Sequence, residues 1–222
     1  MSTALVIGAS RGIGLEFARQ YRADGWRVLA TVRNEDAARR VEALGAQPIT
    51  LDVTDPAGTA RLAAAMADTP LDVALYVAGV MNRAGATKPP SQADFDAIMH
   101  ANVLGAMRLI PHVAPRVAQA RGTLAVLSSG MSLIGSVSGS DCWLYRVSKA
   151  ALNMVMASAR HDWPQAIFVA LDPGWVRTDM GGPSAAISPE QSVSDMRSTL
   201  ARLVPADSGS FLHRDGRREA RW

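Results

Sequence analysis

The chain has 222 residues, which is enough for one well-buried domain and too few for two of ordinary size. Hydrophobic residues make up 48% of the chain and charged residues 19%, a composition that excludes an intrinsically disordered protein. The formal net charge is only +3, so we expect no nucleic-acid partner.

The chain shows no targeting or membrane-spanning signal. No basic segment precedes a long apolar one at the start, and no apolar run approaches the ~20 residues of a transmembrane helix. Cys142 is the only cysteine and cannot form a disulfide within the chain. We therefore expect a cytoplasmic protein with no membrane partner and no bound metal.

Short apolar segments alternate with longer amphipathic segments along the whole chain, without repeats or linkers. The predicted strands are 4–7, 27–32, 47–51, 71–77, 123–127, 166–171 and 210–213. The predicted helices are 13–23, a second one that ends at 41, 56–66, 94–119 with a bend near Pro111 and Pro115, 144–161 and 189–203. Strands that are apolar throughout are buried on both faces, which is typical of parallel sheets. We therefore predict an α/β fold: a single Rossmann domain over residues 1–222, with a doubly wound parallel sheet of about seven strands flanked by helices. Its ligands are expected at the carboxyl ends of the strands.

A glycine-rich turn separates the first strand from the first helix. It runs Gly8-Ala9-Ser10-Arg11-Gly12-Ile13-Gly14. Glycines permit a tight turn and a close backbone approach, so that a pyrophosphate can bind at the helix N-terminus. A flexible surface turn is the alternative, but the position between a buried strand and a helix favours a nucleotide site.

The end of the second strand indicates which nucleotide binds. An NAD site usually has Asp or Glu there to bond the ribose 2′-hydroxyl. This strand ends Val32-Arg33-Asn34, with no carboxylate before Glu35. Arg33 can pair with a 2′-phosphate, and Arg11 can reach the same phosphate from the other side. Two solvated arginines in an arginine-rich chain are the alternative. The sequence therefore predicts NADP(H) rather than NAD(H).

Tyr145 and Lys149 lie four residues apart on a predicted helix and therefore share one face. Lysine occurs only at positions 88 and 149, whereas arginine supplies the other 21 of the 23 cationic side chains. A lysine in this background is expected to serve as a compact ammonium group. A nearby positive charge lowers the pKa of a phenol toward neutrality, so the pair is predicted to move protons.

Together, the glycine turn and Tyr145-x-x-x-Lys149 resemble the short-chain dehydrogenase/reductase superfamily. Residues 145–153 and 173–182 and the closing Trp222 are similar to its C-factor-like branch. The resemblance runs from Ala4 to the C-terminus. It implies hydride transfer between NADP(H) and a small carbonyl or alcohol, with Tyr145 as the acid and base.

The resemblance also implies roles for further residues. Ser129 would polarise the substrate carbonyl, with Ser132 as the rival serine. Asn102 would hold a water in the proton relay; without the resemblance, a helix-interior amide bonded to its own backbone is favoured. The remaining cofactor contacts would be Asp52 and Val53 at the adenine, the small pair Ala78 and Gly79, and Pro173, Gly174, Val176 and Thr178 at the nicotinamide.

The sequence departs from the family pattern after the fourth strand. The family usually has Asn-Asn-Ala-Gly there, and this chain has Tyr76-Val77-Ala78-Gly79. Because the lost amides mainly brace the sheet, we expect less local rigidity and a possible loss of activity.

Other expectations concern the substrate and the assembly. Residues 175–188 are predicted to form a mobile loop over the pocket. Met131, Trp143 and Met180 are either apolar walls of the pocket or plain packing, and Cys142 is expected to be inert.

The helix 144–161 is apolar on more than one face, which favours a homodimer or homotetramer. The alternatives to a reductase are a non-catalytic NADP(H)-binding regulator and an epimerase or dehydratase on the same fold.

Overall fold

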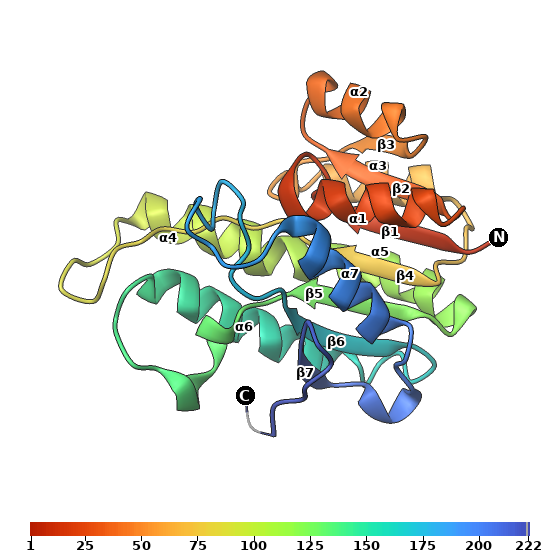
Figure 1. Ribbon diagram of the computed structural model, residues 1–222. Coiled ribbons are helices and arrows are strands. Elements are labelled where there is room, and N and C mark those ends of the chain that lie inside the picture. Colours follow the sequence, from red (N-terminus) through yellow and green to blue (C-terminus); the bar gives the residue numbers. More distant parts are fainter. Residues whose placement is uncertain (221) are drawn as a thin grey trace.

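The computed structural model describes residues 1–220 and 222. Its centre is a seven-stranded parallel sheet with the strand order β3-β2-β1-β4-β5-β6-β7 (Figure 1). The strands are β1 (Thr3–Ile7), β2 (Arg27–Val32), β3 (Gln47–Thr50), β4 (Val73–Tyr76), β5 (Thr123–Leu127), β6 (Ile167–Asp172) and β7 (Ser210–His213). The order reverses between β1 and β4, which is where doubly wound sheets bind their ligands. The predicted fold class is confirmed.

Helices cover both faces of the sheet. They are α1 (Gly12–Ala23), α2 (Glu35–Ala43), α3 (Gly58–Met66), α4 (Gln92–Met99), α5 (Gly105–Ala120), α6 (Trp143–Ala159) and α7 (Pro189–Leu200). One apolar cluster joins the sheet to α3, α5 and α6, and a second joins its other face to α1, α2 and α7. Most boundaries differ from the predicted ones by a few residues, as helix and strand ends commonly do. Within residues 1–220 and 222, the helices are too short or too polar to cross a membrane.

The long helix predicted over residues 94–119 is interrupted, although not at its prolines. Pro111 and Pro115 both lie inside α5. The interruption is a π-helical turn, η1 (His100–Leu104), between α4 and α5. Turns of this kind insert an extra residue into a helix and are frequent at functional sites. The prediction of one unbroken helix was therefore wrong, whereas the bend near the prolines stays a prediction.

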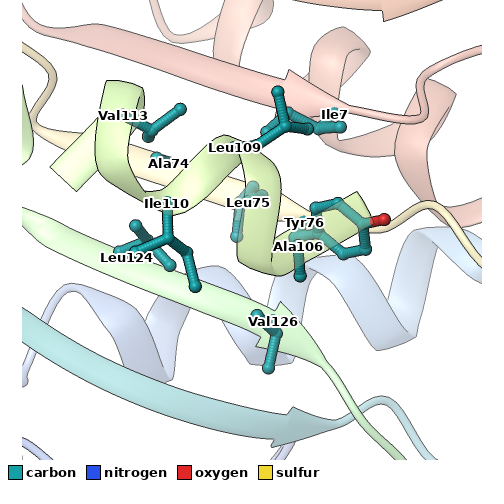
Figure 2. Close-up of a pocket in the computed structure, with 10 residues that line it drawn as sticks. All are labelled: Ile7, Ala74, Leu75, Tyr76, Ala106, Leu109, Ile110, Val113, Leu124 and Val126. Atoms are coloured by element: carbon teal, nitrogen blue, oxygen red, sulfur yellow. The ribbon is translucent and has the colours of Figure 1, made fainter. Parts of the chain in front are cut away.

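The core between the sheet and α5 is tightly packed. Figure 2 shows side chains of α5 lying over residues of β1, β4 and β5, with Tyr76 at one end of this layer. The cavity among them measures about 10 Å³, close to the minimum that a single water needs. It is a small packing gap, and the space for a ligand lies elsewhere, at the carboxyl edge of the sheet.

Candidate active site

A cleft of about 790 Å³ opens at the carboxyl ends of the strands, the edge toward which all arrowheads in Figure 1 point. The predicted site residues that line it are Gly8, Ser10, Arg11, Gly12, Ile13, Gly14, Arg33, Asp52, Val53, Ala78, Gly79, Tyr145, Lys149, Pro173 and Thr178. Four other predicted residues, namely Asn102, Ser129, Gly174 and Val176, are outside this lining. Residues from across the sequence are therefore gathered at one edge of the sheet.

The glycine turn brings backbone close to backbone. Gly8 has a φ of +96°, and a Cβ on it would lie 2.7 Å from the amide nitrogen of Ala78. A Cβ on Gly14 would lie 2.1 Å from the carbonyl oxygen of Gly8. The Gly8 amide donates to Thr31 Oγ1 at 2.9 Å, so a hydroxyl of β2 fixes the turn. A side chain at either glycine would push β1, α1 and β4 apart.

The N-terminus of α1 lies in this cleft with its backbone amides available. In the described part of the chain, no side chain caps this helix, and its first turn contains no acidic residue. By contrast, α2 and α7 are capped by the side chains of Asn34 and Ser188. An uncapped helix N-terminus beside a glycine turn can accept an anion such as a pyrophosphate.

Cations lie on the side of the cleft next to β2. Arg33 lines it and is exposed. Arg11 forms an exposed ion pair with Asp179 at 2.8 Å, which links the glycine turn to the 175–188 segment. Arg40 of α2 donates to the carbonyl oxygen of Ser10 at 3.2 Å. The sequence did not reveal Arg40, because its place beside Ser10 depends on how α2 packs.

Tyr145 and Lys149 are both buried yet line the cleft, with exposed fractions of 7% and 4%. Lys149 Nζ lies 5.6 Å from the centre of the Tyr145 ring and donates to the carbonyl oxygen of Leu127 at 2.6 Å. Burial lowers the pKa of Lys149 to about 8. Burial also raises the pKa of Tyr145 to about 12, although a hydrogen bond with Ser129 acts to lower that pKa. The lowering expected from Lys149 does not appear, because desolvation of the phenol dominates.

The structure separates the two rival serines. Ser132 is buried, and its hydroxyl donates to the Ser129 carbonyl oxygen at 2.6 Å and accepts from Asn153 Nδ2 at 2.8 Å. Ser129 is less buried, its hydroxyl accepts from the Met131 amide at 3.1 Å, and it acts to lower the pKa of Tyr145. The geometry therefore favours Ser129 as the serine that faces a substrate.

Asn102 lies in η1 and is fully buried. Its amide oxygen accepts from the Val80 amide at 2.8 Å, and its amide nitrogen donates to the Val80 carbonyl at 2.9 Å. The same nitrogen donates to Ser148 Oγ at 2.8 Å. The side chain thus joins the segment after β4 to α6 instead of bonding its own helix backbone.

Tyr76 takes over part of the bracing expected from the missing amides. Its buried hydroxyl donates to the carbonyl oxygen of Ala101 in η1 at 2.6 Å. Gly105 leaves room for it, because a Cβ there would lie 2.4 Å from the Tyr76 hydroxyl. Tyr76 therefore fixes the π-helical turn next to Asn102, and the expected loss of rigidity stays a prediction.

Residues that were not predicted as site residues also line the cleft. They include Val80, Ala97, His100, Ala101, Arg177 and Asp179. Of the three side chains left open between pocket wall and packing, Met180 lines the cleft, whereas Met131 and Trp143 are absent from its described lining. Burial raises the pKa of the Cys142 thiol, which disfavours a reactive thiolate. The described residues hold no group of three His, Cys, Asp or Glu side chains arranged to bind a metal ion.

Comparisons with known proteins agree with this geometry. A family model described as short chain dehydrogenase matches residues 2–187. A 1-hydroxy-2-glutathionyl-2-methyl-3-butene dehydrogenase of Rhodococcus sp. (strain AD45) is 31% identical, over 97% of this chain and 98% of its own length. C-signal of Myxococcus xanthus is 35% identical, over 66% of this chain and 90% of its own length.

Solved structures match the whole chain. A short-chain dehydrogenase/reductase from Burkholderia multivorans, solved with bound NADP, has a TM-score of 0.88 and 33% identity, covering 100% of this chain and 99% of its own. The carbonyl reductase Sniffer of D. melanogaster has a TM-score of 0.90 and 27% identity, with both chains fully covered. The chain therefore belongs to the short-chain dehydrogenase/reductase superfamily, a superfamily of oxidoreductases, and to its C-factor-like branch.

Proposed function

We propose that the chain is an NADP(H)-dependent oxidoreductase that interconverts a ketone or aldehyde with the corresponding alcohol, with Tyr145 as the acid and base. The observation that carries this proposal is that the buried side chains of Tyr145 and Lys149 line the same cleft as the glycine turn. The NADP-bound Burkholderia structure and the carbonyl reductase Sniffer support the cofactor and the class of reaction.

The cleft fits a dinucleotide. Its volume of about 790 Å³ lies within the range of cofactor sites. The backbone at Gly8 and Gly14 leaves no space for side chains, so a pyrophosphate can approach the N-terminus of α1. Arg33 and Arg40 place positive charge beyond β2, where an NAD site would have a carboxylate, and this favours a 2′-phosphate. When bound, the cofactor supplies or accepts a hydride.

The residues of this chain would handle the proton and the developing charge. With a pKa of about 12, Tyr145 is protonated at neutral pH, the state needed to donate a proton to a carbonyl oxygen. Ser129 would donate a second hydrogen bond to that oxygen, so that the oxyanion forms among donors already in place. Lys149 would hold the cofactor ribose and provide the positive charge beneath the phenol. Alcohol oxidation needs the deprotonated phenol and should therefore be favoured at alkaline pH.

This proposal is tested by the loss of NADPH absorbance at 340 nm with a panel of aldehydes and ketones. The Tyr145→Phe variant should lose about 10²- to 10⁴-fold in turnover while still binding NADPH in a fluorescence titration. Tyr21→Phe is the matched control, because Tyr21 is also buried but lies on α1 outside the cleft lining.

Near-normal turnover of Tyr145→Phe would contradict the assignment. NADPH binding by the wild type without any carbonyl reduction would favour the regulatory alternative. An epimerase or dehydratase would convert substrate without a net change in absorbance.

A further inference from the structure

A histidine between two carboxylates lies at the same edge of the sheet as the proposed active site. The last paired residues of β6 and β7 are Asp172 and His213. His213 Nδ1 lies 2.9 Å from Asp172 Oδ2, and His213 Nε2 lies 2.6 Å from Glu219 Oε1. The His213 and Asp172 side chains are only 13% and 15% exposed. This cluster takes no part in the mechanism proposed above.

The number of N–H groups on the ring limits how both contacts can be hydrogen bonds. An ionised carboxylate only accepts hydrogen bonds, and a neutral imidazole has only one N–H to donate. Both contacts of His213 are therefore hydrogen bonds only if the ring carries two protons and a positive charge. The charged groups around it are Asp172 on β6 and Asp215, Arg217 and Glu219 in the segment after β7.

The segment after β7 is bound to this histidine. Arg217 pairs with Glu219 Oε1 at 2.6 Å, and hydrogen bonds from His213 and then Arg217 hold the pKa of Glu219 below its usual range. The His213 amide also donates to the Arg217 carbonyl oxygen at 2.8 Å, and the Glu219 amide donates to Phe211. Arg214, the residue after His213, is paired with Asp195 of α7.

Asp172 also lies next to two turns of the proposed active site. Its Oδ1 accepts from the Gly174 amide at 3.2 Å, in the turn matched to the nicotinamide end of the cofactor. Its Oδ2 faces Gly130, where a Cβ would lie 3.4 Å away. Gly130 follows Ser129, so one carboxylate bonds the cofactor turn and lies next to the serine turn.

We propose that His213 is a positioning residue: as an imidazolium held by Glu219, it orients Asp172, and Asp172 fixes the turn at Gly174 beside the turn at Ser129–Gly130. This inference rests on the proposed function, because it needs Ser129 and the Gly174 turn to face the reacting groups. Deprotonation of the ring removes one of its two hydrogen bonds. The contribution of His213 is therefore present while the ring is charged and is lost as the pH rises.

The first test needs no substrate. Nitrogen-15 NMR of the labelled chain, assigned with His213→Asn, should show two protonated ring nitrogens on His213 at neutral pH. In His213→Ala, the amide signal of Gly174 should shift, because Asp172 is no longer held. A neutral ring in the wild type, or an unmoved Gly174 signal, would overturn the proposal even if no carbonyl substrate is found.

The second test is turnover as a function of pH. His213→Ala should reduce kcat for carbonyl reduction about tenfold at neutral pH, because a small displacement of the reacting groups raises the activation barrier. The ratio of wild-type to His213→Ala kcat should fall as the pH rises. His213→Asn keeps a donor toward Asp172 without a charge, so it should restore kcat to within about threefold and show no such dependence on pH. His161→Ala removes an exposed histidine after α6 and should change neither quantity.

A purely structural role would give a different pattern. Loss of folded protein lowers kcat by the same factor at every pH and is not repaired by His213→Asn. A ratio that is constant with pH, or a His213→Ala variant with wild-type kcat, would refute the positioning role. Absence of carbonyl reduction by the wild type would instead refute the proposed function and leave the NMR test to decide on His213.

Discussion

Lys149 is a cation buried at the base of the cleft, and its burial should cost stability. Its pKa falls from 10.5 to about 8 on folding, so the unfolded chain binds more protons between these values. The cost is therefore fully present below pH 8 and disappears as the pH approaches 10.5. Lys149→Met should raise the free energy of unfolding by about 1–3 kcal/mol at neutral pH, after the lost bond to Leu127 is allowed for.

Urea unfolding at neutral pH and near pH 10 measures this effect. The gain from Lys149→Met should shrink at the higher pH, while turnover is lost at both. A variant that is less stable than the wild type at neutral pH would show that the ammonium stabilises the fold.

Arg33 should control the choice between the two nicotinamide cofactors. Because it is exposed and lines the cleft, Arg33→Ala should remove a charge-assisted contact with little effect on folding. A hydrogen bond to a charged group contributes about 1.5–3 kcal/mol, so the Kd for NADPH should rise about 10- to 100-fold and that for NADH should hardly change. Arg39→Ala is the control, because Arg39 pairs with acids of its own helix. Equal effects on both cofactors would contradict a 2′-phosphate site.

Single residues were predictable where their role follows from neighbours in the chain. Arg33 follows a strand directly, and Tyr145 and Lys149 are one helical turn apart. Arg40 and His213 were not predictable, because their contacts depend on how α2 packs and on the register between β6 and β7. The raised pKa of Tyr145 also depends on burial, which local sequence does not reveal.

Among the elements, the π-helical turn η1 departs from regular α-helix and is held by hydrogen bonds to residues outside it. Its carbonyl at Ala101 accepts the hydroxyl of Tyr76, and Asn102 within it bonds both backbone groups of Val80. Tyr76→Phe keeps the ring but leaves a buried carbonyl unpaired, at a cost of about 1–3 kcal/mol. We expect kcat to fall more than the KM for NADPH rises, because the turn that holds Asn102 loosens.

Thermal unfolding and steady-state kinetics separate two roles for this tyrosine. A loss of stability with unchanged kcat would show that Tyr76 only packs and does not position η1. Tyr21→Phe again serves as the control, because Tyr21 lies on the opposite face of the sheet.

The regular elements could be predicted from apolar patterning, whereas η1 could not. The central strands are buried on both faces, and their sequences show it directly, as in Leu124–Val126 of β5. The edge strand β3 is the exception, with Gln47 and Thr50 exposed. The interruption between α4 and α5 lies beside Tyr76, whose hydroxyl bonds the Ala101 carbonyl from 25 residues earlier in the chain. The prolines of α5 gave a local signal for an irregularity, whereas the sequence of His100–Leu104 gave none.

At the scale of the whole molecule, one side of α6 has no covering element in the described chain. Val147 and Met154, seven residues apart on this helix, are 52% and 66% exposed, and Met107 on α5 is 52% exposed. We propose that this surface pairs with a second copy of the chain. In a two-fold interface each substitution acts twice. Met154→Glu should therefore convert a dimer to monomers in sedimentation velocity, and a monomeric wild type would refute the interface.

The glycine turn and Arg33 differ in how freely they can change. A Cβ on Gly14 would collide with the Gly8 carbonyl oxygen at 2.1 Å, so almost any substitution there disrupts the sheet as well as the cleft. Arg33 is exposed and can be exchanged without repacking the core. The capacity to hold a dinucleotide is thus inherited together with the fold, whereas the preference for one dinucleotide over another is open to selection. A lineage of such chains could switch cofactor in a few mutational steps while its core stays unchanged.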